Sequence, residues 1–179
     1  HVENNVHILA RREFVLASIA GDAVLRITAN SRYRLWLNGV EVGRGPSPSY
    51  PRWQYYDLYE VTEYLREGVN VLAVHAYCFG PSMSSALTQD PGPGGLLLEM
   101  AIADRVTVVS DDAWRVLRDS SRDGQTEPIS GHRGGFKERC DLRDEVIGWR
   151  EAGFDDACWP AAEVLGPALG TPPWENLIP

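Results

Sequence analysis

The clearest pattern in the chain is an alternation of apolar and polar residues that begins near position 32. Tyr33, Leu35 and Leu37 fall on one side of an extended segment, and the residues between them fall on the other side. Asn38-Gly39 follows, and this dipeptide is a strong hairpin signal because a tight type I′ turn needs positive φ at both central residues. We therefore expect residues 40–42 to run back beside the first strand.

A loop rich in glycine and proline comes next, because GRGPSPSYP from Gly43 to Pro51 stops regular strand pairing. Residues 53–58 should re-enter the sheet, and residues 61–65 should form one helical turn. Residues 69–78 are apolar at almost every position, so they predict a central strand with both faces covered.

The rest of the chain predicts short strands separated by turns and by two long loops, at 79–95 and 119–135. No long stretch shows helical periodicity. The pattern therefore predicts an all-β domain. Further strands are expected at 13–18, 23–29, 95–103, 106–110, 114–118 and 136–142, with 162–165 closing the sheet.

Composition narrows the class of protein. The 179 residues suit one domain, and a formal net charge of −8 argues against a nucleic-acid surface, which needs an excess of Lys and Arg. No apolar run approaches the roughly eighteen residues of a membrane helix, and the N-terminus, which begins with His1, has no apolar signal core. Three cysteines without CxxC spacing indicate reduced thiols, which favours a cytoplasmic over a secreted protein.

A search for catalytic motifs finds no HExxH, P-loop, GxSxG or dinucleotide fingerprint. His75 lies in the apolar strand, where a buried histidine with a hydrogen-bond partner is the simpler interpretation. The adjacent pairs Asp111-Asp112 and Asp155-Asp156 each precede a tryptophan. Neighbouring carboxylates cannot flank a sugar as an acid and base pair, so both are interpreted as turn residues.

Three separated segments carry a family resemblance: RYRLWLNGVEVGRGP, then YYDLYEVTEYLREGVNVLAV, then GGFKERCDLRDEVIGWREAGFDDACWPAA. In this order they resemble the N-terminal β-sandwich domain of bacterial α-L-rhamnosidases. The resemblance implies a jelly-roll-like β-sandwich, similar to galactose-binding domains, over residues 1–165. Residues 166–179 resemble the Pro-rich linker that leads to the catalytic domain of these enzymes.

In that family the catalytic carboxylates lie in a separate helical barrel, so this chain is expected to be a non-catalytic part of a glycoside hydrolase. Some members bind rhamnose through this kind of domain with calcium, which needs about six or more oxygen ligands. The loop from Gly80 to Gly94 offers only Gln89 and Asp90. We therefore expect no metal site and no cofactor.

Sugar binding is the chemistry that the composition leaves open, because the chain has six Trp and seven Tyr. An aromatic face can stack on a pyranose while guanidinium groups bind its hydroxyls. Aromatic residues at strand entries also anchor loops and interfaces, and the residues alone favour this packing role. The candidate carbohydrate-binding residues are Arg44, Tyr50, Arg52, Trp53 and Tyr55.

Two functions therefore stay open. The first is a carbohydrate-binding or substrate-positioning module for a rhamnose-containing carbohydrate, and the second is a scaffold that packs on its own downstream catalytic domain without sugar affinity. In the scaffold role, Arg133 and the 119–135 loop would lie at the interface. That role also predicts an exposed apolar patch rimmed by polar groups.

Overall fold

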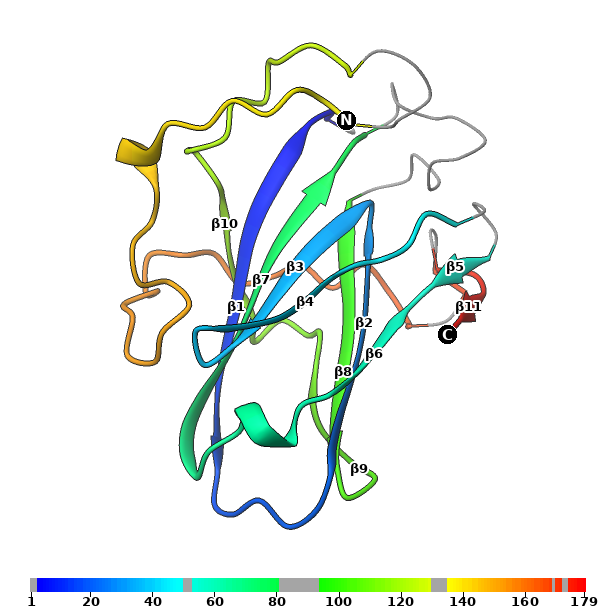
Figure 1. The fold of residues 1–179 in the computed structure, drawn as a ribbon, viewed down its shortest axis with the longest axis vertical. Coiled ribbons are helices and arrows are strands. Elements are labelled where there is room, and N and C mark those ends of the chain that lie inside the picture. The colour runs from blue at the N-terminus through cyan, green and yellow to red at the C-terminus, as the bar shows by residue number, and fades with distance from the viewer. Residues whose placement is uncertain (1–2, 50–52, 81–93, 130–134, 169, 172–173) are drawn as a thin grey trace.

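The chain folds into two antiparallel β-sheets that face each other, as the computed structural model shows (Figure 1). The structure describes residues 3–49, 53–80, 94–129, 135–168, 170–171 and 174–179. Among these residues, no helix is long and apolar enough to cross a membrane. The elements are β1 (Val6–Leu16), β2 (Ala23–Asn30), β3 (Arg32–Leu37), β4 (Val40–Gly45), β5 (Gln54–Tyr55), β6 (Asp57–Glu60), the 3₁₀ turn η1 (Thr62–Tyr64), β7 (Gly68–Cys78), β8 (Gly95–Ile102), β9 (Arg105–Val109), β10 (Arg115–Arg118), the 3₁₀ turn η3 (Leu142–Asp144) and β11 (Leu177–Ile178).

The five-stranded sheet has the order β10-β1-β7-β3-β4, and the four-stranded sheet has the order β6-β2-β8-β9. A short parallel pair joins β11 to β5. The predicted hairpin is confirmed, because Leu37 pairs with Val40 and the φ angles of Asn38 and Gly39 are 52° and 81°. The expected all-β sandwich is therefore the fold.

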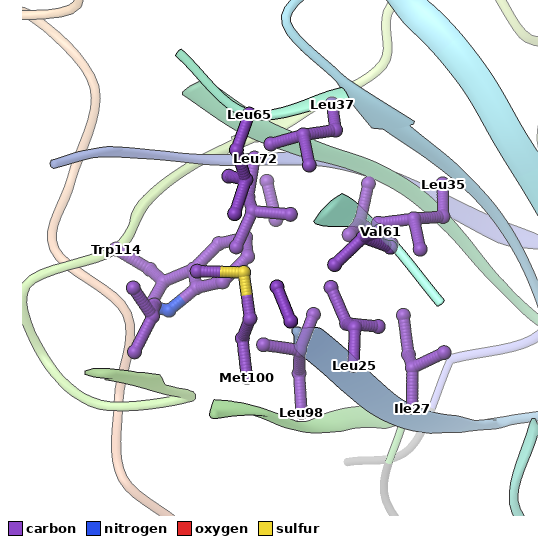
Figure 2. Close-up of a cluster of buried hydrophobic side chains, with 14 of the residues drawn as sticks. Leu25, Ile27, Leu35, Leu37, Val61, Leu65, Leu72, Leu98, Met100 and Trp114 are labelled. Carbon is purple, nitrogen blue, oxygen red and sulfur yellow. The ribbon is translucent and has the colours of Figure 1, made fainter. Parts of the chain in front are cut away.

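The main core lies between the two sheets, and its side chains come from alternate positions of the facing strands. Figure 2 shows Leu25, Leu98 and Met100 of the four-stranded sheet directed toward Leu35 and Leu72 of the five-stranded sheet. All five side chains are at most 1% exposed. The predicted alternation of β3 therefore contributes Leu35 to the core, together with residues of β2, β7 and β8.

A second apolar cluster covers the outer face of the five-stranded sheet. Trp149 and Trp159, from the irregular segment after η3, pack there with Trp36, Val71 and Ala73. This packing explains why β7 is apolar at successive positions, as the sequence predicted for a strand covered on both faces. It also buries Trp36, which alternation had placed on the polar side of β3, to 4% exposure.

Arg11 holds this outer segment in place from the middle of β1. Its side chain is fully buried, and its guanidinium donates to the backbone oxygens of Trp149 (3.1 Å), Glu151 (3.1 Å) and Phe154 (3.4 Å). The same group forms an ion pair with Asp156. One charged side chain therefore binds the start, middle and end of a loop that has no regular structure of its own.

Three strand predictions were wrong in their extent. β1 begins at Val6, seven residues before the expected strand, because its polar residues such as Arg11 find partners on the covered outer face. Residues 136–142 form only isolated bridges, Pro128 with Phe136 and Arg122 with Cys140. Residues 162–165 do not close a sheet, since the pairing to β10 stops at a bridge from Arg115 to Ala161.

The C-terminal segment contains regular pairing. Trp174 is 4% exposed, and β11 lies parallel to β5 through Gln54 N–H to Asn176 O (3.0 Å) and Tyr56 N–H to Ile178 O (2.9 Å). The role of residues 166–179 as a linker toward a further domain stays a prediction.

We expect Arg11→Met to lower the free energy of unfolding by about 3–5 kcal/mol, because it leaves buried carbonyl groups and Asp156 without their partner. Urea denaturation followed by tryptophan fluorescence measures this loss. The matched control is Arg26→Met, whose ion pair with Glu99 is about half exposed and is worth at most about 1 kcal/mol. Equal losses in the two variants would contradict the anchoring role of Arg11.

Candidate functional site

The structure places three of the five predicted sugar-binding residues at the surface. Trp53 and Tyr55 are 55% and 37% exposed, and the side chain of Arg44 is 76% exposed. Tyr50 and Arg52 lie outside the described residues. The exposed aromatic rings leave area free for a ligand, as the sugar-site hypothesis requires.

Trp53 and Tyr55 flank a residue that faces the interior. Gln54 is fully buried, and neither atom of its side-chain amide has a hydrogen-bond partner in the part of the chain described. The backbone of β5 is held on one side by β11 and on the other by Thr28, whose hydroxyl donates to Tyr55 O at 2.8 Å. The alternation along β5 therefore directs the two aromatic rings outward from a fixed backbone.

Arg44 lies on a different element, β4. Its guanidinium is 3.4 Å from the Glu41 carboxylate, which Arg34 also contacts at 2.6 Å. Within the described residues, no hydrogen bond, ion pair or ring contact joins Arg44 to Trp53 or Tyr55. Trp53 directly precedes β5 and Tyr55 lies in it, whereas Arg44 lies on β4 in a charge cluster with Glu41 and Arg34.

A buried polar link fixes the strands at the base of this loop. The Tyr33 hydroxyl on β3 donates to the Asp57 carboxylate on β6 and lies 3.1 Å from the Tyr59 hydroxyl. Burial, followed by the bonds to Asp57 and Tyr59, raises the pKa of Tyr33 well above its usual value, so it remains a donor. The link joins β3, the strand next to the edge of the five-stranded sheet, to the edge strand β6 of the four-stranded sheet.

Two glycines of β4 make room for this link. A Cβ at Gly43 would lie 2.5 Å from the Tyr59 ring, and a Cβ at Gly45 would overlap the Asp57 carboxylate. Sequence reasoning treated these glycines as loop residues and did not identify Tyr33, Asp57 and Tyr59 as a set. Two glycines at alternate positions of one strand indicate that other groups lie close to one face of β4.

The adjacent carboxylates take the turn role expected from the sequence. Asp111 Oδ1 accepts from Ala113 N–H at 3.0 Å, and Asp155 Oδ1 accepts from Ala157 N–H at 3.1 Å. Each turn ends in a buried tryptophan, Trp114 or Trp159. In both segments, a turn closed by an aspartate side chain precedes a tryptophan whose indole ring is buried.

His75 is mostly covered, with 13% of its side chain exposed, and its partner is a second histidine. His7 Nδ1 lies 3.1 Å from His75 Nε2, and the His7 ring stacks on Tyr77 with 4.1 Å between ring centroids. Asp119 and Arg122 complete the cluster, with Asp119 Oδ2 at 3.8 Å from His75 Nε2. Burial lowers the pKa of His7 to about 3 and that of His75 to about 4, so both rings are neutral at pH 7.

The cavity beside this cluster has a volume of about 50 Å³. That is room for a few water molecules and not for a sugar ring. The cluster is therefore part of the packing between β1, β7 and the segment after β10.

Comparison with known proteins gives the family. Residues 19–172 match the family model described as the α-L-rhamnosidase N-terminal domain. The chain belongs to this family. The three segments through which the sequence resembles rhamnosidases all lie within residues 19–172. The β-sandwich fold agrees with this rhamnosidase N-terminal domain.

Two rhamnosidases show how much of such an enzyme this domain represents. An α-L-rhamnosidase from Streptomyces avermitilis is 28% identical over 94% of this chain and 13% of its own length. The crystal structure of the GH78 family rhamnosidase of Bacillus sp. GL1 has a TM-score of 0.91 and 37% identity over 99% of this chain and 18% of that chain. The chain thus spans less than a fifth of the length of either relative.

A protein of another kind shares the fold. The lectin from Pleurotus ostreatus, solved in complex with GalNAc, has a TM-score of 0.58 and 20% identity, covering 99% of this chain and 46% of that chain. At this identity the likeness shows the fold alone.

The sequence predicts no metal site in this chain. In the described part of this rhamnosidase N-terminal domain, no group of three His, Cys, Asp or Glu side chains could hold a metal ion. Gln89 and Asp90, the side chains weighed for calcium, lie outside the described residues. The expectation of no metal site stays a prediction.

We expect Tyr33→Phe to lower the free energy of unfolding by about 1–3 kcal/mol, because the Asp57 carboxylate loses its buried donor. The loss should be measured by urea denaturation at pH 7. Tyr64→Phe is the matched control, since Tyr64 packs against the same core and its hydroxyl makes no hydrogen bond within the described residues. An unchanged midpoint for Tyr33→Phe would show that the link does not stabilise the sheet edges.

The paired imidazoles predict a pH dependence of stability. The pKa values of His7 and His75 in the folded protein, about 3 and about 4, lie below the unfolded value of about 6.5. As the pH falls below about 6.5, the unfolded chain therefore binds more protons than the folded protein does. Stability should therefore drop between pH 7 and pH 5, by about 2 kcal/mol for each imidazole.

Urea denaturation at pH 7, 6 and 5 measures this drop. The variant His7→Phe, which keeps a ring beside Tyr77, should lose less stability over the same range. A wild-type stability that is equal at pH 7 and pH 5 would contradict the burial of neutral histidines.

Proposed function

We propose that this chain is the carbohydrate-binding accessory domain of an α-L-rhamnosidase-type glycoside hydrolase. In this proposal the domain binds a rhamnose-containing carbohydrate and presents it to a catalytic domain elsewhere in the polypeptide. The catalytic carboxylates lie outside this chain, and its own paired aspartates serve its turns.

The observation that carries the proposal is the exposure of Trp53, directly before β5, and of Tyr55 within it. Large aromatic rings are usually covered, and these two are exposed from a strand whose backbone is bonded on both sides. An indole ring on a fixed backbone can stack on the C–H face of a sugar with little ordering of the chain on binding. The arrangement therefore favours binding over loop anchoring, for which the rings would be buried.

Two further observations support the proposal. The Pleurotus ostreatus lectin shows that this fold occurs in a sugar-binding protein. The relatives are named for an enzyme that acts on rhamnosides, which makes L-rhamnose the first ligand to test. Arg44 and its neighbour Glu41 lie on β4, where they would contact a longer oligosaccharide and not the sugar stacked on Trp53.

Calorimetric titration with L-rhamnose and with a rhamnose-containing oligosaccharide tests this function. We expect saturable binding of the purified chain, and we expect Trp53→Ala to raise the dissociation constant at least about fivefold, because stacking contributes about 1 kcal/mol beyond area burial. Leu142→Ala, at a side chain that is 71% exposed on η3, should bind as the wild type does.

Each titration is repeated with calcium and with chelator, which tests the expectation of metal independence. No heat of binding in any arm would contradict the proposed function. Binding that survives both Trp53→Ala and Tyr55→Ala would contradict the proposed position of the site.

A further inference from the structure

Three guanidinium groups from three separate segments line the small cavity beside the histidine pair. Arg34 comes from β3, Arg122 from the turn after β10 and Arg150 from the segment after η3. The cavity has a volume of about 50 Å³. Like charges around one cavity repel each other, so the site favours a group that carries negative charge.

Two of these guanidinium groups have N–H donors without an acceptor. Nε of Arg122 and Nε of Arg150 are buried, and neither has a hydrogen-bond partner among the described residues. Asp119 Oδ2 lies 3.7 Å from Arg122 Nε, which is beyond hydrogen-bond distance. A buried donor without an acceptor is destabilising, so both donors favour a bound acceptor in the cavity.

Two carboxylates also line the cavity, and both already have partners. Asp119 Oδ1 accepts from the backbone N–H and the hydroxyl of Ser121, at 3.0 Å and 2.6 Å. Glu145 Oε1 lies 3.4 Å from Arg150 Nη2. Among the described lining residues, three guanidinium groups and two carboxylates leave one positive charge, because His75 is neutral at pH 7. One monovalent anion would neutralise this charge.

Two further carboxylates contact the guanidinium groups without lining the cavity. Glu41 lies 2.6 Å from Arg34, and Glu138 forms an ion pair with Arg122. The side chains of Glu41 and Glu138 are 31% and 65% exposed, so water and salt weaken their effect on the cavity.

The His75 ring senses the charges around the cavity. Burial lowers the pKa of His75 most, and the positive charges of Arg122, Arg34 and Arg150 lower it further. Asp119 acts in the opposite direction. The electrostatic potential at this wall is therefore positive, as an anion requires.

The remaining walls are partly apolar. Leu9, Trp36 and Trp149 belong to the outer cluster and also line the cavity, and the Arg150 guanidinium lies 4.6 Å from the centre of the Trp36 ring. A volume of about 50 Å³ admits a small ion, as it admits a few water molecules. Indole rings and weakly hydrated guanidinium groups suit an anion that loses its water readily, such as chloride.

We propose that this cavity binds one small monovalent anion, a halide or a carboxylate, between Arg34, Arg122 and Arg150. The anion accepts from the two buried Nε–H groups and neutralises the lining. It joins β3 to the turn after β10 and to the segment after η3. β5 contributes no residue to the described lining, so the site is separate from the proposed sugar site.

Urea denaturation at pH 7 in a chloride-free buffer, with sodium chloride added stepwise, tests the anion site. A ligand that binds only the folded protein stabilises it, and above the dissociation constant each tenfold rise in chloride raises the ratio of folded to unfolded protein about tenfold. We expect this dependence in the wild type. Arg150→Gln should lose it, because one donor and the excess charge are removed.

The matched control is Arg105→Gln, at an exposed position of β9 outside the cavity lining. It has the same net charge as Arg150→Gln, so general effects of salt are equal in the two variants, and it should keep the chloride dependence of the wild type. Arg34→Gln, at a side chain that is 45% exposed, is the second variant if Arg150→Gln does not fold. Equal chloride dependence in the cavity variant and the control would overturn the proposal.

Bromide provides a direct measurement. Crystals grown in sodium bromide should give an anomalous peak between the three guanidinium groups in the wild type and none in Arg34→Gln. Water alone in the cavity would overturn the proposal. A peak without chloride dependence in solution would mean an adventitious ion only, and would overturn it as well.

Sodium formate in place of sodium chloride separates the two kinds of anion. An equal stabilisation would support a site for carboxylates and halides, and stabilisation by chloride alone would support a site for halides. No sugar is present in these measurements, and the calorimetric test of sugar binding does not depend on the anion. The two proposals therefore fail separately.

Discussion

The segment that covers the outer face of the five-stranded sheet depends on the hydrogen bonds and the ion pair of the buried Arg11 guanidinium. This guanidinium satisfies three backbone carbonyls and one carboxylate of a segment that has almost no regular hydrogen bonding. Because this segment stays in place, the outer face of β7 can be apolar and the middle of the five-stranded sheet is covered on both sides. Removing a charge of this kind from water is costly, so the folded chain must provide acceptors for nearly all of the N–H groups of Arg11.

Local rules predicted the parts of the fold that are local in origin. The Asn38-Gly39 turn, the 3₁₀ turn after Val61 and the apolar run of β7 depend on neighbours in sequence and were confirmed. The first half of β1 was missed because Arg11 lies inside it, and a charge normally argues against burial. What makes Arg11 compatible with a buried strand lies about 140 residues away, in a segment whose position no local pattern gives.

The candidate site also has features that the sequence predicts and features that depend on distant residues. Composition pointed to the loop that carries Trp53, and the exposure of Trp53 and Tyr55 follows from simple alternation along β5. The Tyr33, Asp57 and Tyr59 link could not be predicted, because it joins strands of two different sheets. Arg44 was grouped with the aromatic residues by proximity in sequence, and the structure shows that it also pairs with Glu41. Distances between strands of different sheets are the information that one sequence lacks.

The parallel pairing of β11 with β5 has a mechanical consequence. Within the described residues, β11 is joined to β5 by the hydrogen bonds from Gln54 N–H to Asn176 O and from Tyr56 N–H to Ile178 O, so a displacement of β11 acts first on these bonds. The Thr28 hydroxyl of the neighbouring four-stranded sheet donates to Tyr55 O and ties β5 to that sheet. Displacement of β11 is therefore transmitted to β5, which carries Tyr55 and directly follows Trp53, before it reaches the core.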